Sequence, residues 1–314
     1  MKARAYYLKF SAPITGLPRA PTLFGHLAWV TLWGGGKEGL ESFLRAFEQD
    51  PPPFLLSSAF PVAQRGEERL PLLPRPKVLP YMVEDTRIRK SLKKIRYLTF
   101  ELFREIARNG DEALARLMGG EDYEIEKGAL VPRGFKLPLT VEERTRVGIA
   151  RTTGTHAPGV LFSDRATRLE EAVVYARFTS EIYGASWFLS ALKEVGKYGF
   201  GGKKSIGYGS FEVEDGGEME LPEAKNANAY TLLSPALPPD GDGWYSLEPY
   251  WGRLGEHFAL SSNPFKRLYL RAVEGSTFRS RPGGSLLDVT PEPAPEPGVS
   301  IREYLFPLTL GVQV

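Results

Sequence analysis

Gly199-Phe200-Gly201-Gly202-Lys203-Lys204-Ser205-Ile206-Gly207-Tyr208-Gly209 is a segment in which five of eleven residues are glycine. Glycine accepts positive φ angles and lets a backbone approach a ligand without a Cβ in the way. Successive backbone amides can then hold a phosphate, and lysines beside them add positive charge. The segment, called the glycine loop below, is therefore a candidate phosphate-binding site. The alternative is a flexible connection, which leaves the regular spacing of the glycines unexplained.

The two common nucleotide-binding loops do not match the glycine loop. A Walker A loop needs Ser or Thr directly after Gly-Lys, but Lys204 follows Gly202-Lys203. The dinucleotide-binding loop needs a third glycine at the position of Lys204. The glycine loop also follows an expected helix and precedes an expected strand, which is the reverse of both nucleotide-binding folds. A nucleotide-hydrolysing enzyme is therefore disfavoured.

Hydrophobic periodicity on both sides of the loop predicts a chain of mixed helices and strands. Strands are expected at residues 1–10, 173–178, 211–213, 229–233, 268–273 and 304–314. Helices are expected at 22–33, in part of 88–106, at 111–118 and at 185–195. Thr22 is the expected N-cap of the first helix, and the three glycines at 34–36 end it. Dense prolines between Pro51 and Pro80 exclude long helices there.

The chain has 314 residues, about twice the length of a usual domain, so two domains are expected. The elements repeat as a strand–helix pattern on either side of residues 165–172, which predicts the α+β class. The expected N-terminal domain covers 1–168 and carries the proline-rich segment and a basic insertion. The expected C-terminal domain covers 169–314 and carries the glycine loop.

Composition excludes several kinds of site. The chain has no cysteine, which rules out zinc-ribbon, iron–sulfur and thiol chemistry. Its three histidines, His26, His156 and His257, are far apart and have no metal-ligand spacing. No metal and no cofactor are expected. The start of the chain has no signal-peptide pattern and no window is apolar enough for a membrane span, so a cytoplasmic protein is expected.

Positive charge is clustered although the chain is nearly neutral. Lys and Arg number 40 against 38 Asp and Glu, a formal net charge of +2. Basic groups nevertheless gather at 87–96, 144–151, 193–204 and 266–281. A single cluster of this kind is often only a solvated face. Four clusters, two of them beside glycine-rich or hairpin elements, favour a track for a polyanion.

The glycine loop resembles the C-terminal glycine-rich loop of the RAMP superfamily of CRISPR RNA-binding proteins. Three other segments support the resemblance: residues 22–29 resemble the opening of that family's first helix, 93–103 a basic insertion, and 144–154 with 159–162 an arginine-bearing hairpin. Within the superfamily, the chain is most similar to the subunits of type III-A interference complexes that cap the 5′ handle of CRISPR RNA.

The resemblance implies a fold and a role. The fold is two ferredoxin-like, RRM-like domains with irregular insertions and a glycine-rich loop. The role is non-catalytic: binding the single-stranded 5′ handle of CRISPR RNA and linking the large polymerase-like subunit to the backbone RAMP subunit in antiviral defence. No membrane partner is implied. The equivalent subunit of a type III-B complex remains an alternative.

The resemblance also assigns residues to RNA binding. The glycines let the RNA backbone approach, Lys203, Lys204 and Ser205 contact phosphates, and Tyr208 stacks on a base or is a buried core tyrosine. In the hairpin, arginines and threonines line the handle, or else form a salt-bridged hairpin. The full set is Thr22, Phe24, Gly25, His26, Arg144, Arg146, Arg151, Thr152, Thr153, Gly199, Gly201, Gly202, Lys203, Lys204, Ser205, Gly207, Tyr208 and Gly209.

His26 has a competing interpretation. Related RAMP endoribonucleases use an early histidine as general acid or base, so a metal-independent RNA-processing enzyme is the alternative function. His26 lies in an apolar helical segment, and no second histidine or tyrosine stands at a supporting spacing. A packed or RNA-contacting histidine is therefore the favoured interpretation.

Overall fold

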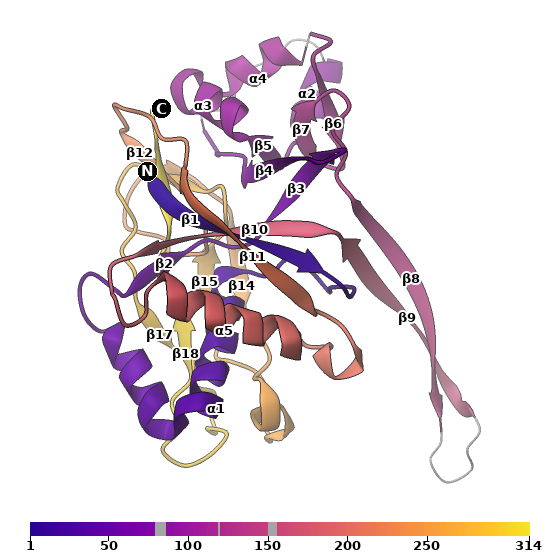
Figure 1. The fold of residues 1–314 in the computed structure, drawn as a ribbon, viewed down its shortest axis with the longest axis vertical. Coiled ribbons are helices and arrows are strands. Elements are labelled where there is room, and N and C mark those ends of the chain that lie inside the picture. Colours follow the sequence, from indigo (N-terminus) through magenta and orange to yellow (C-terminus); the bar gives the residue numbers. More distant parts are fainter. Residues whose placement is uncertain (79–85, 119, 150–155) are drawn as a thin grey trace.

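A computed structural model describes residues 1–78, 86–118, 120–149 and 156–314 (Figure 1). Its centre is a βαββαβ unit. The unit consists of β1 (Lys2–Phe10), α1 (Ala20–Ala46), β2 (Phe54–Leu56) with β3 (Phe60–Arg65), β10 (Glu171–Phe178), α5 (Ala185–Tyr198) and β11 (Phe211–Glu220). The glycine loop connects α5 to β11, so it joins a helix to a strand as the sequence predicts.

Strand β1 lies at the middle of this unit. The sheet order is β11-β1-β10-β3, with β1 antiparallel to both neighbours: Leu8 pairs with Ala172 on β10 and with Val213 on β11. A βαββαβ chain with this strand order is ferredoxin-like. The predicted boundary at residue 168 is therefore corrected, because strands from both sides of it pair in one sheet.

A large insertion separates β3 from β10 (Figure 1). Its elements are β4 (Glu68–Pro74), α2 (Thr86–Leu92), β5 (Tyr97–Thr99), α3 (Phe100–Asn109), α4 (Asp111–Leu117), β6 (Tyr123–Glu126), β7 (Ala129–Pro132), β8 (Leu139–Ile149) and β9 (His156–Leu169). Strands β4, β5, β7 and β6 extend the central sheet. Strands β8 and β9 form the predicted hairpin, which projects away from the body of the molecule.

The chain after Glu220 is built from short strands. They are β12 (Ala229–Leu232), β13 (Gly243–Trp244), β14 (Leu247–Tyr250), β15 (Tyr269–Ala272), β16 (Thr277–Phe278), β17 (Leu286–Asp288), β18 (Arg302–Tyr304) and β19 (Thr309–Val312), with a 3₁₀ turn, η2 (Glu256–Leu260). All of 221–314 is described, and it contains no α-helix. The second ferredoxin-like unit predicted for 169–314 is therefore not formed there, because the one helix in that range, α5, belongs to the first unit.

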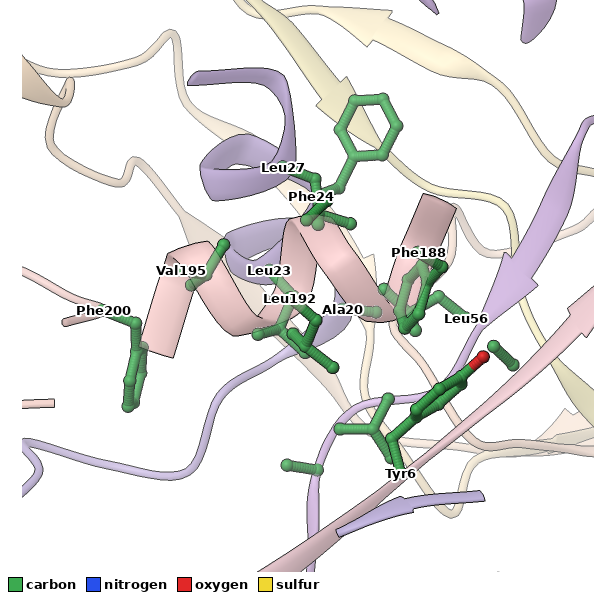
Figure 2. Close-up of a cluster of buried hydrophobic side chains, with 14 of the residues drawn as sticks. Tyr6, Ala20, Leu23, Phe24, Leu27, Leu56, Phe188, Leu192, Val195 and Phe200 are labelled. Atoms are coloured by element: carbon green, nitrogen blue, oxygen red, sulfur yellow. The ribbon is translucent and has the colours of Figure 1, made fainter. Parts of the chain in front are cut away.

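Side chains of the central strands alternate between two cores, since successive strand residues point to opposite faces. Tyr6 and Leu8 of β1 face α1 and α5, where Leu23, Phe188 and Leu192 complete the packing (Figure 2). On the opposite face, Ala5 and Tyr7 pack with residues of α3 and of the C-terminal strands. The central sheet is therefore covered on both sides, which leaves surface function to its loops and edges.

Helix α1 begins earlier than the sequence predicts. Its N-cap is Arg19 and Pro21 lies in its first turn, so Thr22 is inside the helix and the predicted N-cap at Thr22 is wrong. Proline suits the first turn because its missing N–H is not needed there. The predicted break at the three glycines is confirmed: Gly36 has φ of 65° and non-helical ψ, and the helix continues to Ala46 after this kink.

Phe24 lies within the aromatic part of the core. Its ring is 4.8 Å from that of Tyr304 and 5.2 Å from that of Phe43, centroid to centroid, and its side chain is 2% exposed. Its assignment to RNA binding is therefore wrong, because the ring is enclosed by other aromatic rings.

Replacing Phe24 with alanine removes these contacts and leaves a cavity. We expect the Phe24→Ala variant to lose about 3 to 5 kcal/mol of unfolding free energy, measured by urea denaturation. Phe24→Leu should lose clearly less. A loss below about 1 kcal/mol for Phe24→Ala would contradict the placement of this ring in the core.

Candidate nucleic-acid interface

The two ends of the glycine loop lie against each other. The amide of Phe200 donates a hydrogen bond to the Gly209 carbonyl at 3.1 Å. A Cβ on Gly209 would stand 2.2 Å from the carbonyl oxygen of Phe200, and the φ of Gly209 is 79°. A Cβ on Gly199 would stand 2.6 Å from the backbone carbonyl oxygen of Tyr208. These two glycines are therefore needed to close the loop.

Gly202 and Gly207 face outward instead. A Cβ added to either would meet no atom within 4 Å. Both residues are exposed, as is Ser205 between them. Gly202, Ser205 and Gly207 thus form an exposed part of the loop, called the open glycine face below, which a phosphate backbone can approach closely.

The base of the β8–β9 hairpin packs against the loop. The Lys203 ammonium forms an ion pair with Asp164 of β9, and the Tyr208 hydroxyl donates to the same carboxylate at 3.0 Å. Arg144 is the cross-strand neighbour of Asp164, and its guanidinium carbon lies 5.8 Å from the centre of the Tyr208 ring. The structure thus brings together two groups that the sequence predicts separately. Tyr208 is 2% exposed, so it is the buried tyrosine of the two alternatives.

Lys204 contacts the C-terminal region on the other side of the loop. Its ammonium forms an ion pair with Glu256 of η2 and lies 5.7 Å from the Trp33 ring centre. Glu256 has φ of 53°, a left-handed conformation that few non-glycine residues adopt. Both loop lysines are therefore held in place by carboxylates, and each keeps donors for a further anion because an ammonium carries three hydrogens.

His26 of α1 contacts the glycine loop through a hydrogen bond. Its Nε2 accepts a hydrogen bond from the amide of Gly201 at 3.0 Å. Burial, and then the positive charge of Lys204, lower the pKa of His26 to about 4. The ring is therefore neutral at physiological pH with Nε2 occupied. This arrangement suits a packed histidine and does not suit a general acid.

One face of α1 carries the residues that meet the loop and its surroundings. Residues 19, 22, 26, 29 and 33 follow the three–four spacing that places side chains on one side of a helix. Arg19, the N-cap residue, directly precedes this face, His26 lies in its middle and Trp33 ends it. The opposite face of α1, with Ala20, Leu23, Phe24 and Leu27, is buried in the core.

Aromatic residues that the sequence interpretation did not select lie beside Lys204. The Trp33 ring is 4.9 Å from Tyr198 of α5, and the Trp29 ring is 6.2 Å from Trp33 and 5.7 Å from Phe258. Trp33 and Tyr198 are 45% and 58% exposed. Exposed aromatic rings beside a cation form a surface on which unpaired bases can stack. The spacing of Trp29 and Trp33 on α1 was the available signal, since both continue the face that carries His26.

The remaining residues predicted to bind RNA lie on α1, on the described part of the hairpin, or outside the described residues. Thr22 and Gly25 lie on α1, and neither is fully buried. Arg144 forms a 3.1 Å ion pair with Glu142, and Arg168 of β9 pairs with the same carboxylate, so this part of the hairpin is salt-bridged. Arg146 lies on β8, and Arg151, Thr152 and Thr153 lie outside the described residues.

The basic group at 266–281 does not form one surface. Arg271 is 2% exposed and paired with Glu248, and Lys266 is paired with Glu303. Arg279 and Arg281 instead lie over the rings of Trp244 and Tyr230.

Comparison with known proteins identifies the class. The model of the RAMP superfamily matches residues 19–212. Because the match covers more than half of the chain, this chain belongs to the RAMP superfamily, as the glycine loop indicates. No helix among the described residues has the length and apolar content that crossing a membrane requires.

The similarity extends to one kind of subunit within that superfamily. The protein named CRISPR system Cms protein Csm4 from Streptococcus thermophilus is 28% identical over 295 residues, which cover 88% of this chain and 85% of the relative. The protein of the same name from Thermococcus onnurineus (strain NA1) is 27% identical over 310 residues, covering 96% and 94%. Within the RAMP superfamily, the chain is thus similar to Csm4, which confirms the predicted resemblance to a subunit of CRISPR interference complexes.

Solved structures share the fold. A chain of the Csm3-Csm4 subcomplex in the type III-A CRISPR-Cas interference complex has a TM-score of 0.64 at 16% identity, covering 99% of this chain and all of that one. A chain of the Csm1-Csm4 cassette in complex with cA4 has a TM-score of 0.63 at 21% identity, covering 100% of this chain and 99% of that one.

The difference between the two kinds of loop glycine can be measured. We expect Gly209→Ala to lose about 2 to 5 kcal/mol of unfolding free energy, because alanine is strained at positive φ and its methyl group overlaps the Phe200 carbonyl. Gly202→Ala is the matched control and should unfold within about 0.5 kcal/mol of the wild type. Equal losses in thermal or urea denaturation would show that the loop is not closed at Gly209.

Lowering the pH should reduce the contribution of His26 to the free energy of unfolding. The folded-state pKa of about 4 lies below the unfolded value of about 6.5, so between these values the unfolded chain binds a proton that the folded chain does not. His26 therefore costs stability as the pH falls, on the order of 1 to 2 kcal/mol at about pH 5. In a His26→Gln variant, the glutamine side chain can accept from the Gly201 amide without titrating. The stability difference, wild type minus His26→Gln, should fall between about pH 7.5 and pH 5; a constant difference would contradict a neutral buried ring.

Proposed function

We propose that this chain is a non-catalytic subunit of a type III-A CRISPR effector complex that binds the 5′ handle of CRISPR RNA. The observation that carries the proposal is the convergence of the open glycine face, the hairpin base and the polar and aromatic face of α1 on one surface. Phosphates lie against Gly202, Gly207 and the two loop lysines, where contacts fix register without reading sequence.

Unpaired bases stack on the rings of Trp33 and Tyr198, which lie beside Lys204. These two rings, and not the buried Tyr208, provide the stacking contact. The projecting hairpin contacts the handle beyond the loop, and the resemblance assigns Arg146, Arg151, Thr152 and Thr153 to that contact. The position of Arg144 at the hairpin base, against the loop, supports this arrangement.

The partners proposed for this chain are those found with Csm4 in solved structures. Solved structures contain Csm4 with Csm1 and with Csm3. We therefore propose that this chain links a large polymerase-like subunit to a backbone RAMP subunit, and that it acts in the cytoplasm in antiviral defence. The type III-A assignment is supported by the names of these relatives.

The non-catalytic role is supported by the state of His26. Its Nε2 is occupied by the Gly201 amide, and its low pKa means that the imidazolium form, the acid that could protonate a leaving group, is not populated at neutral pH. These features favour binding over cleavage.

Charge placed on the open glycine face tests the RNA-binding proposal without disturbing the fold. Gly202 accepts a side chain sterically, so Gly202→Glu, Gly202→Gln and Gly202→Lys differ mainly in charge. We expect the affinity for a single-stranded handle RNA, measured by filter binding of the purified protein or its assembled complex, to rank Lys above Gln above Glu. Affinity for each should fall steeply with salt because bound phosphates release counterions.

The same preparations test the linked claims. Changing Lys203 and Lys204 together to Glu should abolish retention of CRISPR RNA during purification with the partner subunits. Equal affinity across the Gly202 series would remove the loop from the RNA site. Cleavage of precursor RNA by the wild type but not by His26→Ala would replace the proposed role with the endoribonuclease.

A further inference from the structure

A cleft with a volume of about 1,020 Å³, lined by apolar, aromatic and charged residues, lies at the start of α1. Its walls come from four parts of the chain: the loop after β1, residues 58–60 where the chain passes from β2 into β3, the insertion around the ends of β4 and β5, and β13 with the turn at Glu274 in the C-terminal region. The amide of Lys77 donates to the Gly275 carbonyl at 2.7 Å, which fixes the insertion against the C-terminal turn. The cleft is therefore built by contacts between distant segments.

Positive charge in the cleft exceeds the negative charge available to neutralise it. Arg19 is held by Glu274 and Glu248, and Arg75 by Asp111 at 2.6 Å. Two further lining cations, Lys77 and Arg96, form no ion pair with any residue in the described part of the chain. Burial lowers the pKa of Lys77, and the nearby charge of Glu274, which already holds Arg19, only partly offsets this effect.

Aromatic rings stand beside these cations. Tyr245 is 45% exposed and stacks on Phe278 at 5.1 Å, so its ring is fixed while much of it remains accessible. Trp244 and Tyr97 line the same cleft and are partly buried. Aromatic faces with nearby unpaired cations fit the two halves of a nucleotide, a flat base and an anionic phosphate.

The cleft is connected to the proposed RNA surface through α1. Arg19, the N-cap residue of α1, lines the cleft, and His26 contacts the glycine loop seven residues further along the chain. Seven residues rise about 10 Å along a helix, close to the length of roughly three stacked nucleotides. A single strand that crosses the loop is therefore close enough to reach the cleft.

We propose that this cleft binds one unpaired nucleotide of single-stranded RNA, with the base among Tyr97, Trp244 and Tyr245 and its phosphate on Lys77 and Arg96. The proposal rests on the RNA-binding role proposed above and adds a second contact point to it. A free mononucleotide has the same chemistry, so the experiment separates the two sources.

The test uses full-length protein and two probes. One is a fluorescein-labelled single-stranded RNA of about eight nucleotides carrying 4-thiouridine for cross-linking, and the other is AMP. The cleft variant is Lys77→Gln with Arg96→Gln. Its matched control is Lys2→Gln with Lys225→Gln, two exposed lysines outside the cleft. Thermal denaturation confirms that each variant is folded.

We expect the cleft variant to bind the RNA about tenfold more weakly than the control, with a salt slope smaller by about 1.4, since two phosphate-neutralising groups are lost. Trp244→Ala should weaken binding more than Trp244→Phe, which keeps a ring. Cross-links should map to Tyr97, Trp244 or Tyr245. AMP should bind at least tenfold more weakly than the RNA.

Other results would overturn the proposal in distinct ways. If Gly202→Glu weakens RNA binding while the cleft variant matches its control, the cleft is not part of the RNA site and the proposed function stands. If neither changes binding, both proposals fail. If AMP binds as tightly as the RNA, and the cleft variant loses affinity for AMP but not for the RNA, the cleft is a mononucleotide site.

Discussion

The pairing of β1 with β10 on one side and β11 on the other is the interaction on which the remaining architecture depends. It joins residues at the start of the chain to residues near its middle and fixes the direction in which α5 must run. Because α5 precedes β11, the glycine loop must turn the chain at the end of α5, beside the loop that follows β1. The 2.9 Å hydrogen bond from the Gly209 amide to the Pro13 carbonyl joins these two turns. The position of the loop is thus a consequence of sheet order.

The described surface combines a rigid support with an open face. His26, Asp164 and Glu256 come from a helix, a strand and a 3₁₀ turn, and each holds a different residue of the loop. Carboxylates that pair with the lysines also reduce the net positive charge, which fits a chain with a formal charge of only +2. Binding of an anion there depends on backbone approach and lysine placement more than on bulk charge.

The sequence was sufficient to predict features that depend on local chemistry. The strand at 1–10, the helices at 111–118 and 185–195, the hairpin and the break at Gly36 follow from periodicity and glycine placement, and the structure contains each of them. Domain division was not predictable in this way, because β1 finds its partners about 160 and 200 residues later. Helical periodicity places Phe24 and Trp33 on opposite faces of one helix, but it does not show which of these faces is buried. Nor does it show that Tyr208 lies inward against a carboxylate whose position depends on the hairpin.

The long insertion between β3 and β10 has a consequence for synthesis of the protein. Strand β1 leaves the ribosome first, yet its second neighbour, β11, ends at Glu220, more than 200 residues later. At about 5 to 20 residues per second, the edge of β1 that pairs with β11 stays without its partner for roughly 10 to 40 seconds on the nascent chain. The insertion has its own apolar core of helices and strands, so it can become compact during that interval. The order of translation thus favours folding from the insertion outward, with the central sheet completed last.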